Sequence, residues 1–218
     1  MAKKYSAEDI LFFNRENFYR LCNKVSKQDD ELKLIIRTHG FPPMWTRSNT
    51  FASLIHIILE QQVSLQSAKA AFLKLNQKLG QIKPEKLLAL TDDEMRSCYF
   101  SRQKMGYARH LAETLISGQL NLRKLPGFTD DLIRTTLKQV KGIGDWTTDI
   151  YLLFALRRTD IFPLGDLAMV NALKEVKKLA KETTRENILE IGNSWRPYRS
   201  IATMLLWHHY IQTRNIRL

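Results

Sequence analysis

The chain has 218 residues, of which 44% are apolar and 26% charged, so it can bury a core without disulfide bonds or metal staples. It carries 34 lysines and arginines against 22 acidic residues, and the net charge of +12 suits a polyanionic partner such as nucleic acid. Charge alone does not distinguish such a partner from an ordinary solvated basic surface.

The N-terminal segment and the cysteines bear on location. The segment MAKKYSAEDILFFNRENF has no apolar stretch long enough for a signal peptide, and no later segment reaches transmembrane length. Cys22 and Cys98 are too few for a metal cluster and too far apart for a redox pair. We expect a soluble intracellular protein, in the cytoplasm or nucleoid (the nucleus in a eukaryote), with no membrane partner and no metal held by side chains.

Apolar residues recur at three- and four-residue spacing through nearly the whole chain, and alternating β patterns are scarce. This predicts an all-α protein of about ten to twelve helices. Helix starts, marked by a hydroxyl cap before an acidic residue, are predicted at Ser6–Asp9, Thr91–Glu94 and Thr129–Asp130. Helix stops, marked by glycine or proline, are predicted at 40–43, 80–84, 118, 142–144, 162–165 and 192.

No low-complexity, repeated or Ser/Gly-rich stretch interrupts the chain. Residues 1–218 are therefore predicted to form a single unit of two helical lobes, whose boundaries the sequence does not define. A cleft between such lobes would be an ordinary place for a ligand site.

The segment LKQVKGIGDWTTD, residues 137–149, lies between two helical patterns. Its Gly142-Ile143-Gly144 core predicts a tight turn whose backbone can approach another surface, and the next helix begins at once. Free amides at that helix start suit a phosphate, which they would grip without reading base sequence. The alternative interpretation is an ordinary glycine-capped connection between helices.

Asp166 follows Trp146 by 20 residues, in the segment IFPLGDLAMV. An aspartate at a helix start is most often a simple N-cap. The same position favours the anionic carboxylate, which could stabilise a cationic sugar or orient a water molecule. The two roles are compatible.

The segment VKGIGDWTTD, followed at this spacing by PLGD, resembles the helix-hairpin-helix DNA glycosylases with a Gly/Pro-rich loop and a catalytic aspartate. The segments FASLIHIILEQQVS from Phe51, FSRQK from Phe100 and WRPYRS from Trp195 through Trp207 resemble the alkylbase branch, the 3-methyladenine DNA glycosylase II type. The resemblance covers roughly Phe51 to the C-terminus, in the right order. It implies a two-lobed helical bundle with a helix-hairpin-helix DNA-binding motif at about 130–158 and a cleft between the lobes.

The resemblance also implies roles for particular side chains. Asp166 would be the catalytic carboxylate, and Trp146 and Trp207 would line the base pocket. Tyr151 could line either the pocket or the core, and Trp45 is a weaker pocket candidate. Composition alone would place Trp207 in a helix core.

Further implied roles concern the DNA backbone. Backbone carbonyls of Lys138, Val140 and Ile143 would hold a structural Na⁺ or K⁺ shared with a phosphate, near the amides of Gly142 and Gly144. No cofactor is required for the reaction itself.

Gln62 falls where alkylbase relatives place a side chain that fills the gap left by a flipped nucleotide, although some members use an apolar wedge there. Ser64, in the same segment, is a further DNA-binding candidate. Arg102 and Lys104 could touch phosphates, or could simply be solvated.

The implied activity is hydrolysis of the N-glycosidic bond of alkylated purines such as 3-methyladenine and 7-methylguanine, flipped out of damaged double-stranded DNA by a monomeric enzyme. Bifunctional relatives carry a lysine where this chain has Trp146, so no Schiff base or strand cleavage is expected. Without a four-cysteine set, the chain also differs from iron–sulfur members. Ile150 and Leu167 stand where some relatives have tyrosines, which predicts a less aromatic pocket.

Two other functions stay open on these patterns. A non-catalytic protein could use the same hairpin to bind DNA, although it would not need a carboxylate facing phosphates. A bifunctional glycosylase/lyase would form a covalent adduct with DNA.

Overall fold

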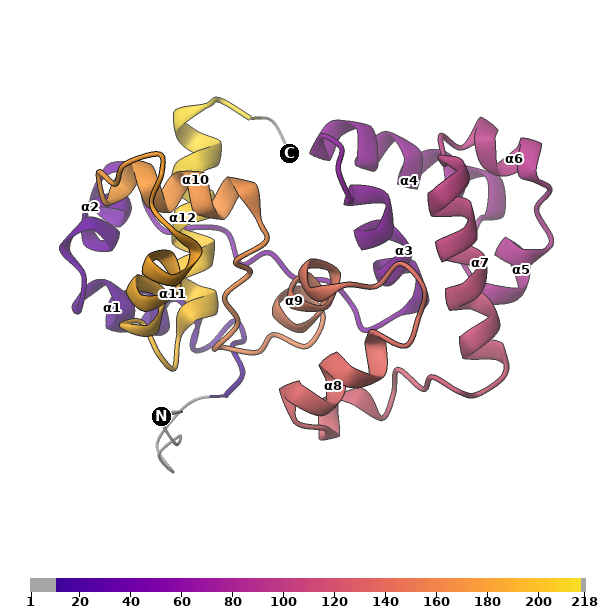
Figure 1. Cartoon of the computed structure of the whole chain (residues 1–218), viewed down its shortest axis with the longest axis horizontal. Coiled ribbons are helices and arrows are strands. Elements are labelled where there is room, and N and C mark those ends of the chain that lie inside the picture. Colours follow the sequence, from indigo (N-terminus) through magenta and orange to yellow (C-terminus); the bar gives the residue numbers. More distant parts are fainter. Residues whose placement is uncertain (1–10, 217–218) are drawn as a thin grey trace. The chain divides into compact units, whose positions relative to one another are not determined.

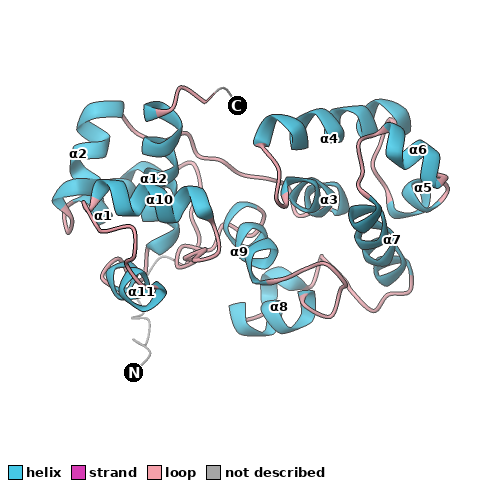
Figure 2. Ribbon diagram, turned by 45° about the horizontal axis from the view of Figure 1, so that its top comes forward, coloured by secondary structure: helices cyan, strands magenta, loops and turns pink. Residues whose placement is uncertain are grey.

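The computed structural model of this chain describes residues 11–216, and their regular structure is helical (Figure 2). These residues form twelve α-helices and one short 3-10 turn, Leu125–Gly127. An isolated antiparallel bridge joins Phe12 to Arg158. The all-α prediction is confirmed, whereas the predicted helix start at Ser6–Asp9 lies outside the described residues.

Packing divides the chain into two compact units (Figure 1). Unit 1 contains the described residues 11–46 and 152–216, and unit 2 contains residues 47–151. The helices of unit 1 are α1 (Phe18–Ser26), α2 (Asp30–His39), α10 (Leu167–Val176), α11 (Arg185–Asn193) and α12 (Arg199–Thr213). Those of unit 2 are α3 (Phe51–Glu60), α4 (Leu65–Leu79), α5 (Pro84–Leu88), α6 (Asp92–Ser97), α7 (Arg102–Ile116), α8 (Asp130–Leu137) and α9 (Asp145–Phe154), whose last residues pass into unit 1.

The C-terminal helix α12 is the centre of unit 1. Its residues from Ser200 to His208 are all buried, and α1, α2 and α10 pack on it (Figure 1). A helix that is apolar on most sides must be enclosed by other elements. This position at the centre of the unit fixes where Trp207 lies.

In unit 2, helices α3 and α7 carry most of the packing. Helix α7 contacts α3, α5 and α6, and α3 also packs on α4. The sequence of α3 is apolar along most of its length, and Thr50 caps its start by accepting the Ser53 amide. These two helices support the turn between α8 and α9 that is described below.

The predicted caps within the described residues are confirmed. Thr91 and Glu94 form a reciprocal capping box at α6, and Thr129 accepts the Leu132 amide at the start of α8. Gly192, predicted to stop a helix, instead lies inside the last turn of α11. A Cβ there would come within 2.6 Å of the Phe162 ring, so close packing explains this glycine.

No helix among residues 11–216 is long and apolar enough to cross a membrane. In that same part of the chain, no three histidine, cysteine or acidic side chains gather in a way that could hold a metal ion. Both cysteine thiols are buried, and burial raises the pKa of Cys22 to about 12. Cys22 is therefore an unreactive packing residue.

Candidate functional site

The Asp166 carboxylate lies at the start of α10 and is held by two donors. Its Oδ1 atom accepts the Met169 amide at 2.8 Å, which confirms the predicted N-cap. The same oxygen accepts the Trp207 Nε1–H at 2.9 Å. A carboxylate bound to one backbone donor and one buried indole has a fixed orientation. We call Asp166, Met169 and Trp207 the carboxylate cluster.

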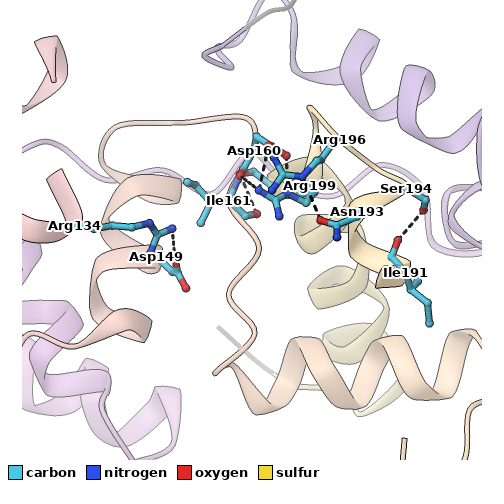
Figure 3. Close-up of polar contacts among 10 residues, drawn as sticks. Arg134, Asp149, Asp160, Ile161, Ile191, Asn193, Ser194, Arg196 and Arg199 are labelled. Atoms are coloured by element: carbon cyan, nitrogen blue, oxygen red, sulfur yellow. Dashed lines mark hydrogen bonds and ion pairs between the residues drawn. The ribbon is translucent and has the colours of Figure 1, made fainter. Parts of the chain in front are cut away.

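The segment between α9 and α10, which leads to this cluster, is bound to residues at the start of α12. Figure 3 shows that Asp160 binds both Arg196 and Arg199, whose Nη1 and Nε atoms lie 3.0 and 2.6 Å, respectively, from its carboxylate oxygens. The Ile161 amide donates to Ser200 Oγ at 2.9 Å. The segment from Asp160 to Asp166 is thus attached to α12 at both ends. Asp160 binds Arg199 at the start of the helix, and Asp166 binds the Trp207 indole.

The surroundings of the cluster are partly aromatic. Trp207 is 8% exposed, and its ring centroid lies 5.4 Å from that of Phe154. Leu167, next to Asp166, is 78% exposed and could contact a ligand, whereas Ile150 is buried. Of the two positions where some relatives carry tyrosine, only the one at Leu167 therefore presents its side chain at the surface.

The remaining pocket candidates have different environments. Tyr151 is buried in unit 2 and donates to Asn49 Oδ1 at 2.5 Å, and burial raises its pKa. Of the two predicted alternatives for Tyr151, the structure places it in the core. Trp45 in unit 1 is partly exposed, and its ring centroid lies 6.4 Å from that of His208. Trp146 is partly exposed in the first turn of α9.

Helices α8 and α9 and the turn between them form the expected helix-hairpin-helix in unit 2. Arg134 on α8 pairs with Asp149 on α9 at 2.5 Å (Figure 3). Within the turn, Gly142 has φ +88°, and a Cβ there would overlap the ring of Tyr107. This position therefore needs glycine both for its backbone conformation and for its space.

The polar groups of the turn are held from two sides. The Lys141 amide donates to His110 Nδ1 at 3.0 Å, and the Gly142 carbonyl accepts from Gln61 Nε2 at 2.9 Å. Among residues 11–216 we find no hydrogen bond donated by the amides of Gly142 and Gly144, and such amides before a helix suit an anion. The sequence did not reveal that Gln61, directly after α3, and His110 on α7 support the turn, because nothing local marks them.

The loop after α3 presents Gln62. This exposed residue has φ +56°, a left-handed conformation that is uncommon for a residue other than glycine. Ser64 caps α4 by accepting the Ser67 amide, and Arg102 is exposed in the first turn of α7. Lys104 instead donates to the Leu59 carbonyl at 2.7 Å, and burial lowers its pKa. The ammonium group of Lys104 therefore binds a backbone carbonyl in the last turn of α3.

The predicted site residues therefore fall into two groups. Asp166, Trp207 and Trp45 belong to unit 1. The hairpin, Trp146, Gln62 and the basic residues of α7 belong to unit 2.

The chain is similar to known proteins both in sequence and in structure. A family described as "HhH-GPD superfamily base excision DNA repair protein" matches residues 55–197. DNA-3-methyladenine glycosylase 1 of Schizosaccharomyces pombe is 30% identical over 190 residues, which cover 84% of this chain and 83% of that protein. The Bacillus subtilis protein YfjP, named as a candidate DNA-3-methyladenine glycosylase, is 28% identical over 184 residues; the match covers 81% of this chain and 64% of the relative. The solved structure of S. pombe 3-methyladenine DNA glycosylase in complex with abasic DNA matches with a TM-score of 0.80 at 27% identity, over 86% of this chain and 95% of that one.

Proposed function

The chain belongs to the HhH-GPD superfamily of base excision DNA repair proteins, and on that premise we propose that it is a monofunctional DNA glycosylase for alkylated purines in double-stranded DNA. The observation that carries this proposal is the Asp166 carboxylate, held by the Met169 amide and the Trp207 indole. A protein that only binds DNA needs no carboxylate fixed in this way, since a negative charge repels phosphates.

The hairpin would hold the DNA backbone. The amides of Gly142 and Gly144 would donate to a phosphate oxygen, and the net charge of +12 would draw the duplex to the protein. Because these contacts involve no base edges, the grip would be independent of sequence.

A monovalent cation would complete this contact. The carbonyls of Lys138, Val140 and Ile143 are hard oxygen donors from one turn. Val140 accepts the Ile143 amide at 3.0 Å, and within residues 11–216 we find no hydrogen bond to the other two carbonyls. This donor set fits Na⁺ or K⁺, which would supply positive charge between the turn and the phosphate.

Gln62 would fill the space left when a nucleotide leaves the stack. Flipping costs a few kcal/mol and is easiest at a damaged base pair. The exposed side chain on a left-handed backbone, with Val63 beside it 45% exposed, suits insertion into the helix.

The chemistry follows from the charge of the lesion. An alkylated purine such as 3-methyladenine is cationic, stacks well on the electron-rich face of an indole such as that of Trp207, and leaves without a strong general acid. As the bond to the base breaks, Asp166 would stabilise the oxocarbenium-like sugar and orient the water that adds to C1′. The water loses a proton, and the base departs with the bonding electron pair.

Trp146 makes the reaction hydrolytic. An indole cannot attack the sugar as an amine, so no covalent enzyme–DNA intermediate would form. Borohydride added during turnover is expected to trap no protein–DNA adduct. A trapped adduct would overturn the monofunctional assignment while leaving glycosylase activity intact.

The deciding experiment measures base release from methylated duplex DNA. Wild-type protein should release free 3-methyladenine and leave heat-labile abasic sites, and Asp166→Asn should reduce the single-turnover rate by about 100-fold or more. Asp93→Asn, which changes a surface carboxylate whose side chain is 89% exposed, should match wild type. If wild type releases no more base than Asp166→Asn, the alternative of a non-catalytic DNA-binding protein is correct.

A further inference from the structure

Gln61 directly precedes Gln62. Whereas Gln62 is exposed, the side chain of Gln61 contacts the hairpin. Its Nε2 atom donates to the Gly142 carbonyl and to Thr147 Oγ1, both at 2.9 Å. An amide nitrogen has two hydrogens, and both are used here. One side chain at the end of α3 thus binds the turn and the first part of α9.

These bonds hold one peptide group of the turn at both ends. The carbonyl of the Gly142–Ile143 peptide accepts from Gln61, and its N–H donates to Val140 at 3.0 Å. Glycine at 142, with φ +88°, would otherwise allow this peptide to turn over. Because neighbouring amides change direction with it, the Gln61 bond keeps the Gly142 and Gly144 amides presented together.

The base from which Gln61 acts is itself fixed. Arg47 binds the Glu60 carboxylate with two nitrogens, at 2.8 and 2.5 Å. Lys104 donates to the Leu59 carbonyl at 2.7 Å. The backbone that carries both Gln61 and Gln62 is therefore anchored at the two residues that precede them.

We propose that Gln61 is a positioning residue that locks the hairpin turn in its phosphate-binding form and sets it in register with Gln62. The inference rests on the proposed DNA-binding function, and within it assigns neighbouring glutamines opposite tasks. Gln61 faces inward and orders the protein, and Gln62 faces outward to the DNA.

The test is binding to undamaged duplex DNA over a range of salt concentrations. Gln61→Met keeps the size of the side chain and its neutrality but has no N–H donor. We expect its affinity to fall by about tenfold at every salt concentration while the slope of log affinity against log salt stays as in wild type, because the lost phosphate contact is made by uncharged amides. Gln77→Met, the same change on the exposed side of α4, should match wild type in both.

Single-turnover base release at saturating DNA separates positioning from general damage to the fold. For Gln61→Met this rate should stay within about threefold of wild type, because binding rather than chemistry is impaired. A purely structural role would lower the melting temperature and the active fraction and leave the DNA affinity of the active molecules unchanged. Gln61→Glu, whose carboxylate repels the Gly142 carbonyl, should lose at least as much affinity and provides a second variant if the first folds poorly.

Wild-type affinity in both Gln61 variants would overturn the proposal, whatever the enzymatic activity. Conversely, weaker DNA binding by these variants, in a protein whose wild type releases no base, would leave Gln61 its role and refute only the glycosylase function. The two proposals therefore fail on different measurements.

Discussion

In unit 1, the side chain of Asp166 binds one partner close in the sequence and one distant partner. Asp166 would cap α10 in any helical protein with this sequence, since the bond to Met169 spans three residues. The bond from Trp207 spans 41 residues and comes from the core of the unit. The bond from Trp207 is not needed for the cap, and its contribution to the proposed reaction can be tested.

Replacing Trp207 by phenylalanine keeps an aromatic ring but removes the N–H donor together with part of the indole's volume. A hydrogen bond to a charged group contributes about 1.5–3 kcal/mol, so we expect base release to slow by about 10- to 100-fold. Single-turnover kinetics on methylated DNA would measure this, with the melting temperature as the control for folding. A wild-type rate would show that the indole does not orient Asp166.

Asp29 is a buried carboxylate at the start of α2, and it makes the stability of unit 1 depend on pH. Burial acts to raise its pKa, but hydrogen bonds from Lys177, the Leu32 amide and Trp195 outweigh this and leave the pKa lowered. A lowered folded-state pKa gives stability that is complete above the unfolded value of about 3.9 and is lost as pH falls through the folded value. Acid should therefore destabilise the protein.

Asp29→Asn should reduce the free energy of unfolding at pH 7 by about 2 kcal/mol, because Lys177 loses a charged hydrogen-bond partner and keeps only Glu31. The difference from wild type should shrink as pH falls from about 5 to 2. Urea unfolding at a series of pH values would test this. A difference that is constant across the range would mean that the ionised carboxylate is not the source of the stability.

Among the secondary structure elements, the hairpin depends most on its neighbours. Its two helices are short, and the turn between them rests on Tyr107 and His110 of α7 and on Gln61 after α3. Isolated helices of this length are marginal in water, so packing must supply the stability. Substitutions at two glycines of this turn, with a third glycine outside it as the control, separate the packing of the turn from its contact with DNA.

Gly142→Ala should displace the turn, because the new Cβ overlaps Tyr107 and φ +88° is strained for alanine. We expect a lower melting temperature and a loss of DNA affinity of about tenfold or more. Gly144→Ala meets no atom within 4 Å, so it should melt like wild type but bind DNA more weakly if its amide lies near a phosphate. Gly127→Ala also meets no atom and should change neither property.

Across the entire chain, the dominant property is the net charge of +12. Each phosphate that the protein neutralises releases counterions, so binding should weaken with salt whether or not the DNA is damaged. For about four phosphate contacts, affinity for an undamaged duplex should fall on the order of a hundredfold between 50 and 200 mM salt. Fluorescence anisotropy would measure the affinity at each salt concentration. An affinity that does not change with salt would contradict binding to the DNA backbone.

How far the site could be predicted depends on the range of its contacts. The caps at Thr91, Thr129 and Asp166 join residues three positions apart, so their letters and spacing sufficed. Apolar periodicity likewise indicated an all-α chain, because it reflects burial of one helix face. The family resemblance supplied Gln62 and Trp207 as candidates without their geometry.

Only the tertiary structure decided which distant side chains hold those candidates. Gln61 reaches Gly142 across 81 residues, Tyr107 lies against the same glycine, and Trp207 reaches Asp166 across 41. Tyr151, open between pocket and core, lies in the core. Caps and periodicity are set by bonds within a turn of helix and can be read along the chain, whereas these contacts exist only after each unit has packed.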